Sequence, residues 1–540
     1  NTYLGLLRDS VLGITLQNNE FTMVQKGNML TPAPLDLAMR RKGEDWPWIG
    51  LTRSGGERLE RLAATIISSG SPVGDYVFCG GVWRGGTATF ARGLLDATGN
   101  SDSRVVVLGD FVPRAQSIWS WRTGMPPQKV EMYNYTSVSL DEVVQNLENH
   151  VEGSTLDPDR TAVFQLGDNS FTTEGAALLY LNVKDTDELS RCLDSLKGNL
   201  LPGGQVIIER DAPVTTLDII QAALGAGEAT ETDGFITWRH GGAAGAARSI
   251  PPPESIARQY LNLVKRSVVA ITLGTSEFSY DWDRTGIPTQ EKENFKKDQR
   301  DPGIDWPWIG TTMVGTARLN QLEDLLLDVF QNGVQGDYVE CGSWRGGASV
   351  FAKAMFEAHG EGDRRVWVYD SFQGLPPNRT KLDDLFWSKM DHLRVPRDDV
   401  VRNFESHGLL DDNVIVVKGY FVDSLPTSPI EKLSILRADG DMYESTLDIL
   451  FNLYDKLSVG GYVIIDDSPR LGPSDRAIAD FRKWHGIESE ITVVHDSIMG
   501  CHWRKDKEVK LQRQHYAEIL TSSASRGYQE SLIARAKEEL

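Results

Sequence analysis

The chain contains the same domain twice. The hexapeptide DWPWIG occurs at 45–50 and again at 305–310, and YLGLLRDSVLGITL (3–16) corresponds to YLNLVKRSVVAITL (260–273). Further matches follow in the same order, so the period is near 260 residues. Solenoid repeats are far shorter, roughly 20–50 residues. The sequence is therefore a tandem duplication of a whole domain, and each copy must fold around a core of its own.

The two copies are separated by a segment with a different composition. GGAAGAARSIPPPES contains glycines, alanines and three successive prolines, which are typical of a linker that is stiff at its proline end. We expect a first domain over 1–240, a linker over 241–256, and a second domain over 257–540 that ends in a helical tail.

Within each copy, short apolar runs alternate with helical patterns. The runs are continuously β-branched, which indicates strands buried on both faces, as in a parallel sheet. We therefore predict an α/β fold: two tandem Rossmann-like domains, each a mostly parallel sheet with helices on both faces. In the second copy the expected strands are DYVECG, RVWVYD, NVIVVKG, KLSILRAD and GYVIIDD.

Composition excludes several classes of protein. A net charge of −20 argues against nucleic-acid binding, which needs clustered basic residues. No apolar run approaches the roughly 20 residues of a membrane span, and the first residues lack the pattern of a signal peptide. The missing initiator Met is compatible with a longer parent protein. The four cysteines form no CxxC pair, so we expect neither a disulfide framework nor a zinc site, and a cytoplasmic location.

One candidate site follows the first strand of the second copy. In VECGSWRGG the strand ends at Glu340, and Gly342, Gly346 and Gly347 allow a tight turn. The spacing differs from the G-x-G-x-x-G of dinucleotide folds, and an acid before the turn would repel a pyrophosphate but attract a sulfonium. Asp370, at the end of the next strand, is placed to bind ribose hydroxyls. These residues favour S-adenosylmethionine; the alternative is a turn that the glycines need only for packing.

A second candidate site consists of aspartates at two later strand ends. Asp439, Asp466 and Asp467 would resist ionising together unless a cation neutralised them. Oxygen ligands without His or Cys suit Mg²⁺, which lowers the pKa of a bound hydroxyl, and an aspartate could then take the proton. In the alternative, Asp439 and Asp441 cap the helix that begins near YEST, and the Asp466–Asp467 pair is simply solvated.

The first copy provides an internal comparison. Phe78 replaces Glu340 and Gly109 replaces Asp370, whereas Trp83, Arg84, Gly85 and Gly86 are retained. At the three aspartate positions the first copy has Asn182, Glu209 and Arg210. No metal is expected there. DWPWIG is retained in both copies, so its tryptophans are expected to pack rather than to react.

Several motifs of the second copy, among them DWPWIGTTMVGTARLNQL, YVECGSWRGGAS and LRADGDMYESTLDILFNLYDKLSVGGYVIIDD, together resemble the macrocin O-methyltransferase family. The resemblance covers roughly 258–505 and implies class I methyltransferase domains that use S-adenosylmethionine and Mg²⁺ to methylate sugar hydroxyls. It implies metal ligands Asp439, Asp466 and Asp467, with Asp439 also the catalytic base. The implied cofactor-binding residues are Thr311, Thr312, Glu340, Gly342, Ser343, Trp344, Arg345, Gly346, Gly347, Asp370 and Asn413.

Two further points follow from the resemblance. Ser468 and Pro469 stand where the family carries an aromatic residue, which puts substrate contacts in doubt. The segment 377–394 resembles the family's mobile substrate lid, and it contains His392, the one histidine worth testing for catalysis. The prediction is an O-methyltransferase active in its C-terminal half. The degenerate N-terminal copy either acts as an intramolecular pseudo-dimer partner or completes the acceptor site. The acceptor is a small, glycosylated molecule, and further homo-oligomers stay open. A non-catalytic scaffold and an NAD or nucleotide-sugar oxidoreductase are the alternatives.

Overall fold

The chain divides into two compact units in the computed structural model. Unit 1 comprises Asn1–Ser267 and Ile271–Glu277, and unit 2 comprises Val268–Ala270 and Phe278–Leu540. The structure describes residues 2–520 except 27–28, 43, 48–49, 69–72, 81–82, 101, 113–129, 132–137, 151–158, 169, 184, 197, 210–215, 226, 233–234, 242–252, 283–287, 295, 384–389 and 470–471. Helix α10 (Pro253–Val268) begins inside the segment expected as a linker, most of which lies outside the described residues.

Unit 2 contains a seven-stranded sheet in the order β16-β15-β14-β17-β18-β20-β19. The strands from β16 to β18 are parallel, and β20 runs antiparallel to β18. All five predicted strands of the second copy are present in this sheet. The strand bounds are β14 (Asp337–Cys341), β15 (Val366–Asp370), β16 (Val414–Lys418), β17 (Leu433–Ala438), β18 (Leu457–Ile465), β19 (Thr492–Val493) and β20 (Cys501–Arg504).

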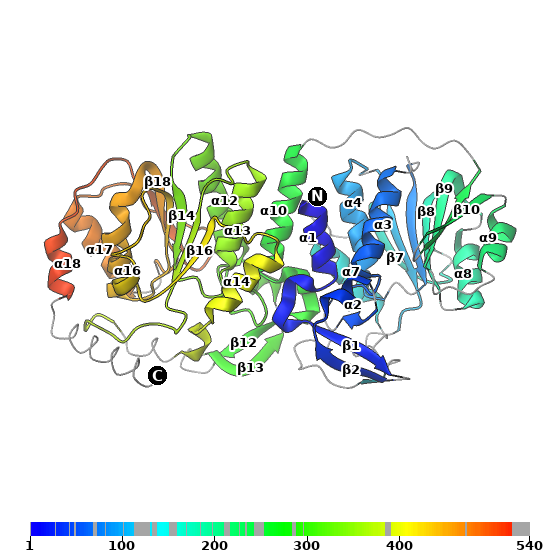
Figure 1. The fold of residues 1–540 in the computed structure, drawn as a ribbon, viewed down its shortest axis with the longest axis horizontal. Coiled ribbons are helices and arrows are strands. Elements are labelled where there is room, and N and C mark those ends of the chain that lie inside the picture. Colours follow the sequence, from blue (N-terminus) through cyan, green and yellow to red (C-terminus); the bar gives the residue numbers. More distant parts are fainter. Residues whose placement is uncertain are drawn as a thin grey trace. The chain divides into compact units, whose positions relative to one another are not determined.

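Helices cover both faces of this sheet, as predicted (Figure 1). Helices α12, α13 and α14 lie on one side of the strands, and α16 and α17 lie on the other, where buried apolar side chains form one core with the sheet. The helix bounds are α11 (Lys297–Arg300), α12 (Gly315–Gln331), α13 (Gly347–Ala358), α14 (Arg397–Ser406), α15 (Phe421–Ser424), α16 (Tyr443–Leu453), α17 (Gly472–His485) and α18 (Arg513–Leu520), and β12 (Phe278–Trp282) pairs with β13 (Pro288–Asn294).

Unit 1 repeats the architecture. Its main sheet has the order β7-β5-β4-β8-β9-β11-β10, with β11 antiparallel to β9. The strands are β4 (Asp75–Gly80), β5 (Val105–Gly109), β7 (Thr161–Gln165), β8 (Ala176–Asn182), β9 (Leu200–Glu209), β10 (Gly227–Thr232) and β11 (Phe235–His240). The helices are α1 (Thr2–Val11), α2 (Leu37–Lys42), α3 (Gly55–Ser68), α4 (Gly86–Ala97), α7 (Leu140–His150), α8 (Thr186–Leu196) and α9 (Thr216–Leu224). A smaller sheet contains β1 (Phe21–Lys26), β2 (Met29–Pro34), β3 (Trp46–Pro47) and β6 (Val130–Glu131).

The strand registers of the two units match residue by residue. Phe78 of β4 lies opposite Tyr180 of β8, and Glu340 of β14 lies opposite Arg437 of β17. Because these are the same places in two copies of one sheet, a strand residue of unit 2 can be compared with its counterpart in unit 1 wherever the structure describes both.

The repeated hexapeptide has a structural role. Its aspartate, Asp305, accepts a hydrogen bond from buried Arg300 at 2.8 Å, and Arg300 also donates to the Val269 carbonyl. In unit 1, Arg40 makes the same pair with Asp45 at 3.0 Å. The retained motif therefore anchors a buried arginine in both copies.

The cysteine prediction was wrong for one pair. Cys79 on β4 and Cys192 on α8 form a buried disulfide with their Cα atoms 6.0 Å apart, whereas Cys341 and Cys501 are free and buried. Cys79 and Cys192 are 113 positions apart in the sequence, so their spacing gave no sign that they are in contact. Across the part of the chain that the structure describes, every helix is too short or too polar to span a bilayer.

Candidate active site

A cavity of about 240 Å³ opens in unit 2 beyond the carboxyl ends of β14, β15, β17 and β18. Parallel α/β sheets bind ligands at this edge. The structure brings most of the predicted site residues into the cavity wall: Thr312, Glu340, Gly342, Ser343, Trp344, Asp370, Asp439, Asp466 and Asp467. Thr311, Arg345, Gly346, Gly347 and Asn413 do not line it.

Gly342 is required by the close approach of two strand ends. It has φ +91°, and a Cβ at this position would lie 1.9 Å from the carbonyl oxygen of Asp439. In unit 1, Gly80 has φ +97°, and its Cβ would lie 2.5 Å from the Asn182 carbonyl oxygen. Because the constraint is the same in the copy that lost the carboxylates, this glycine serves the backbone.

Two predicted residues outside the cavity wall, Arg345 and Gly347, hold the glycine turn against the segment 307–311. Arg345 donates to the carbonyls of Pro307, Trp308 and Gly310 at 2.7–3.1 Å. Gly347 leaves no room for a side chain, since a Cβ there would lie 2.8 Å from the Thr311 carbonyl oxygen.

Asn413 lies away from the turn, and its amide donates to the Gly362 carbonyl at 2.8 Å. His392 stacks edge-on against Tyr280 with ring centroids 4.7 Å apart, and its carbonyl oxygen accepts from Trp344 Nε1. Neither Asn413 nor His392 is part of the cavity wall.

Asp370 fastens the glycine turn to the end of β15. Its Oδ2 accepts the backbone N–H of Ser343 at 2.8 Å, and its Oδ1 accepts that of Phe372 at 2.8 Å. Burial raises the pKa of this carboxyl, while the backbone donors oppose the shift. Asp370 therefore shapes the turn and still lies at the cavity edge.

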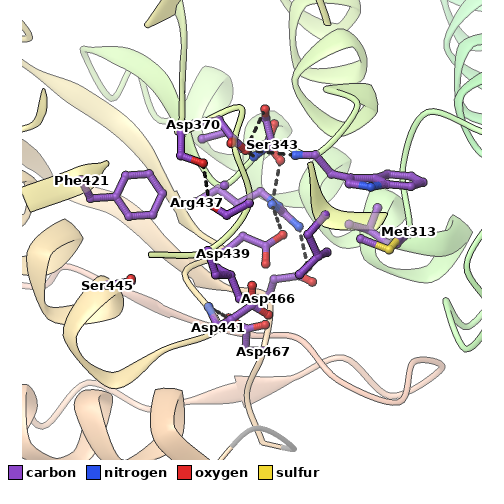
Figure 2. A pocket seen from close by; sticks show the side chains of 18 of the residues that line it. Met313, Ser343, Asp370, Phe421, Arg437, Asp439, Asp441, Ser445, Asp466 and Asp467 are labelled. Carbon is purple, nitrogen blue, oxygen red and sulfur yellow. Dashed lines mark hydrogen bonds and ion pairs between the residues drawn. The ribbon is translucent and has the colours of Figure 1, made fainter. Parts of the chain in front are cut away.

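Glu340 is paired with a protein cation. Its Oε1 accepts from Arg437 Nη1 at 2.7 Å, and its Oε2 accepts from the Ser349 hydroxyl. Burial raises the pKa of Glu340, and the Arg437 charge opposes the shift. Arg437 was not predicted. It contacts Glu340 and also Asp439 and Asp466, both of which Figure 2 labels beside it.

Three aspartates form a cluster that fits a metal ion. One oxygen from each of Asp439, Asp441 and Asp467 lies within 4.8 Å of the others. Asp441 has φ +57°, and its N–H donates to Asp467 Oδ2 at 2.9 Å. Burial, together with the neighbouring carboxylates, raises the pKa values of Asp439 and Asp467, and burial raises that of Asp441 to about 6. This excess of negative charge is what a hard cation would neutralise.

Asp466 contacts two arginines and is not one of the three acids of that cluster. It accepts hydrogen bonds from Arg318 of α12 and from Arg437. Burial disfavours its ionised form, but the two arginines outweigh burial and lower its pKa. Unit 1 retains this pair, because Glu209 accepts from Arg58 at 2.8 Å at the matching positions. Because this ion pair is present in both copies, we infer a structural role for it: it connects α12 to the sheet in unit 2 and α3 to the sheet in unit 1.

The N-terminus of α16 is capped from elsewhere in the chain. Asp383 Oδ1 accepts the N–H of Tyr443 at 2.6 Å, so this cap belongs to the expected lid segment and not to Asp439 or Asp441. Residues 384–389 of the lid lie outside the described residues.

The stem of the lid is fixed by a buried arginine that the sequence did not single out. Arg379 is 1% exposed, contacts Asp448 and lies 3.7 Å from Glu444. Burial raises the pKa of Glu444 to about 9, helped by its hydrogen bond with Asp383, and burial raises that of Asp448 to about 6. Arg379 is thus a positive charge close to both Asp448 and Glu444 at the base of the lid segment.

The Glu444→Gln variant is expected to gain stability relative to the wild type as the pH rises from 5 to 9. The folded-state pKa of Glu444 is about 9 against an ordinary value of 4.5, so the stabilisation by its proton is complete below pH 4.5 and is lost as the pH approaches 9. Through Glu444, the wild-type free energy of unfolding falls by at most about 1.4 kcal/mol per pH unit. Glutamine does not titrate, so the variant lacks this fall. Urea unfolding at pH 5.5, 7 and 8.5 measures the difference, and a difference independent of pH would contradict the prediction.

A seven-stranded, mostly parallel sheet with one antiparallel strand near its edge, helices on both faces and acids at the strand ends defines a Rossmann-like class I methyltransferase. Both units have this fold. The family-wide sequence model described as macrocin-O-methyltransferase matches residues 11–215 and again 257–505. The chain therefore belongs to the macrocin O-methyltransferase family and is an O-methyltransferase, and the double match agrees with the duplication.

Curated relatives carry related names. The chain is 38% identical to mycinamicin III 3''-O-methyltransferase of Micromonospora griseorubida over 47% of this chain and 98% of that protein. It is 41% identical to demethyldecarbamoylnovobiocin O-methyltransferase of Streptomyces niveus, over 39% and 82%. It is 44% identical to 8-demethyl-8-(2,3-dimethoxy-alpha-L-rhamnosyl)-tetracenomycin-C 4'-O-methyltransferase of Streptomyces olivaceus, over 38% and 80%. Among solved structures, the O-methyltransferase NovP is 36% identical, with 46% of this chain and 100% of that chain covered and a TM-score of 0.42.

Proposed function

We propose that unit 2 transfers the methyl group of S-adenosylmethionine to a sugar hydroxyl of a natural product, with Mg²⁺ as second cofactor. The family membership supports O-methyl transfer. The acceptor class is supported by the names of the relatives, one of which contains a rhamnosyl group.

The observation that carries this proposal is the change of charge between the two copies. Asp439, Asp441 and Asp467 stand where the first copy has Asn182, Lys184 and Arg210. The first copy thus has one amide and two bases in place of three acids. The three acids of the second copy are the ones whose oxygens lie within 4.8 Å of one another. Asp466, which faces arginines, is matched by an acid. A selective loss at the cluster is expected if the cluster holds a cation in unit 2 alone.

The residues fit both cofactors. Asp439, Asp441 and Asp467 offer hard oxygen ligands to Mg²⁺. Asp466, which the sequence also proposes as a ligand, would exchange an arginine contact for the metal. When bound, Mg²⁺ lowers the pKa of an acceptor hydroxyl. Asp439 would accept the hydroxyl proton on a carboxylate oxygen as the acceptor oxygen bonds to the methyl carbon and the carbon–sulfur bond of the sulfonium breaks, which releases the cofactor as a thioether.

The cofactor end of the cavity combines carboxylates with apolar side chains. Met313 and Phe421 line the same cavity as Glu340 and Asp370. Such a wall suits an adenosyl group that carries a positive sulfonium. The arginines of the described cavity wall, Arg318, Arg379 and Arg437, each contact an acid of the protein and are therefore not placed to bind a pyrophosphate. This supports S-adenosylmethionine over NAD, and the family relation disfavours a non-catalytic scaffold.

Incubation of the full chain with labelled S-adenosylmethionine and a panel of glycosylated acceptors tests the proposal. We expect methyl transfer that stops when EDTA removes divalent cations and returns when Mg²⁺ is added in excess, because the acid cluster then loses and regains its counter-ion. Transfer that is unaffected by EDTA would remove the metal from the proposal. Calorimetric binding of NAD and not of S-adenosylmethionine would overturn it entirely.

A further inference from the structure

Arg437 joins three carboxylates from three neighbouring strands. It is 3% exposed, and its Nη1 donates to Glu340 at 2.7 Å and to Asp439 at 3.0 Å. Its Nη2 donates to Asp466. A guanidinium is planar and holds its hydrogen-bond partners in a fixed fork, so this side chain sets the positions of the carboxylates relative to one another.

Asp439 belongs both to this arrangement and to the acid cluster. Its Oδ2 accepts from Arg437, while one of its oxygens lies within 4.8 Å of oxygens of Asp441 and Asp467. The other arginines of the cavity wall contact other acids: Arg318 contacts Asp466 and Arg379 contacts Asp448. Within the described cavity wall, Arg437 is thus the cation that contacts Asp439.

Unit 1 shows that the fold does not need this arginine. At the positions of Glu340, Arg437 and Asp439 it has Phe78, Tyr180 and Asn182. The rings of Phe78 and Tyr180 lie 5.4 Å apart between the same two strands, and the Tyr180 hydroxyl donates to Glu209. An aromatic pair thus occupies the place of the ion pair in a sheet of the same strand order. Unit 1 thus lacks the arginine and two of its three partners, Glu340 and Asp439, whereas the third, Asp466, is matched by Glu209, which is paired with Arg58.

We propose that Arg437 is a positioning residue of the methyl transfer, which holds the Asp439 carboxylate in the orientation that serves the cation and the acceptor hydroxyl. This inference rests on the proposed function of unit 2. Residues that orient metal-binding side chains typically change metal affinity by about 10–100-fold when replaced. A shift of a reacting group by about 1 Å costs about 100-fold in rate.

The test compares E340Q with E340Q/R437M. Glutamine removes the Glu340 charge, and Asp466 keeps Arg318 as a partner, so Asp439 is the carboxylate that loses its arginine contact between the two variants. We expect kcat at saturating S-adenosylmethionine and Mg²⁺ to fall about 100-fold from E340Q to E340Q/R437M, with KM for S-adenosylmethionine within about 3-fold. Mn²⁺ affinity, measured by electron paramagnetic resonance without acceptor, should fall at least about 10-fold. Circular dichroism checks that both variants fold.

Values of kcat and Mn²⁺ affinity within about 3-fold of E340Q would overturn the proposal, because Arg437 would then only neutralise Glu340. If the double variant fails to fold, R437K decides. Lysine keeps the charge but cannot hold three carboxylates in a fork, so we expect R437K to lose at least about 10-fold in kcat. Wild-type activity in R437K would overturn the inference. If the wild-type chain transfers no methyl group, the proposed function fails, while the Mn²⁺ comparison still reports whether Arg437 positions Asp439.

Discussion

Asp439→Asn is expected to lower methyl transfer by roughly 1,000-fold without unfolding unit 2. Asparagine has the size of aspartate but accepts no proton, and it removes one of the three charges that would hold Mg²⁺. Asn182 stands at this place in unit 1, where β8 still forms and pairs with β4. The fold therefore tolerates the amide. Initial rates with labelled S-adenosylmethionine and thermal unfolding followed by circular dichroism measure the two effects.

The matched control is the reverse change in unit 1. Asn182→Asp is expected to leave transfer unchanged, because the first copy still has Phe78, Lys184 and Arg210 in the sequence at the positions of Glu340, Asp441 and Asp467. Transfer that survives Asp439→Asn within about 10-fold would contradict the assignment of the proton acceptor. If Asn182→Asp then altered the remaining rate, the reaction would belong to unit 1.

The main elements of the fold could be predicted because each buried parallel strand is a continuous apolar run. Such runs identified β14 to β18 and placed their acids at one edge of the sheet. The two strands beyond β18, β20 and β19, were not predicted. β19 (Thr492–Val493) has two residues and β20 (Cys501–Arg504) has four, so neither gives a run long enough to be recognised.

The contacts among the acids could not be predicted from spacing. Asp466 and Asp467 are adjacent in the sequence, yet one faces two arginines and the other joins the cluster. The turn at Asp441, with φ +57°, brings a third carboxylate to that cluster. The cap of α16 comes from Asp383, which is 60 residues away from the N–H that it accepts.

One useful signal was present in the sequence. Arg58 and Arg318 occupy the same position in the two copies, as do Glu209 and Asp466. Two opposite charges that persist together in a degenerate copy indicate a structural ion pair, which the structure contains in both units. The same comparison separates Asp466 from the acids that were lost.

Gly342→Ala is expected to destabilise unit 2 by roughly 3–6 kcal/mol, the sum of backbone strain and overpacking. The alanine Cβ would lie 1.9 Å from the Asp439 carbonyl oxygen, and the Asp439 backbone is held in place by its N–H, which donates to the Cys341 carbonyl at 2.9 Å. Urea unfolding followed by circular dichroism measures the change in the free energy of unfolding.

Gly360→Ala is the matched control for this glycine. Gly360 also has a left-handed φ, +73°, but no atom lies within 4 Å of its added Cβ, so only the backbone strain of about 1–2 kcal/mol remains.

The pair of variants separates the two explanations that the sequence left open for the glycine turn. If packing requires Gly342, its alanine variant loses far more stability than Gly360→Ala. If the glycine instead serves a bound cofactor, the two variants are equally stable, and only Gly342→Ala loses affinity for S-adenosylmethionine. Gly80→Ala in unit 1 should then be as mild as Gly360→Ala, whereas the packing explanation makes it as severe as Gly342→Ala, because its Cβ would lie 2.5 Å from the Asn182 carbonyl oxygen.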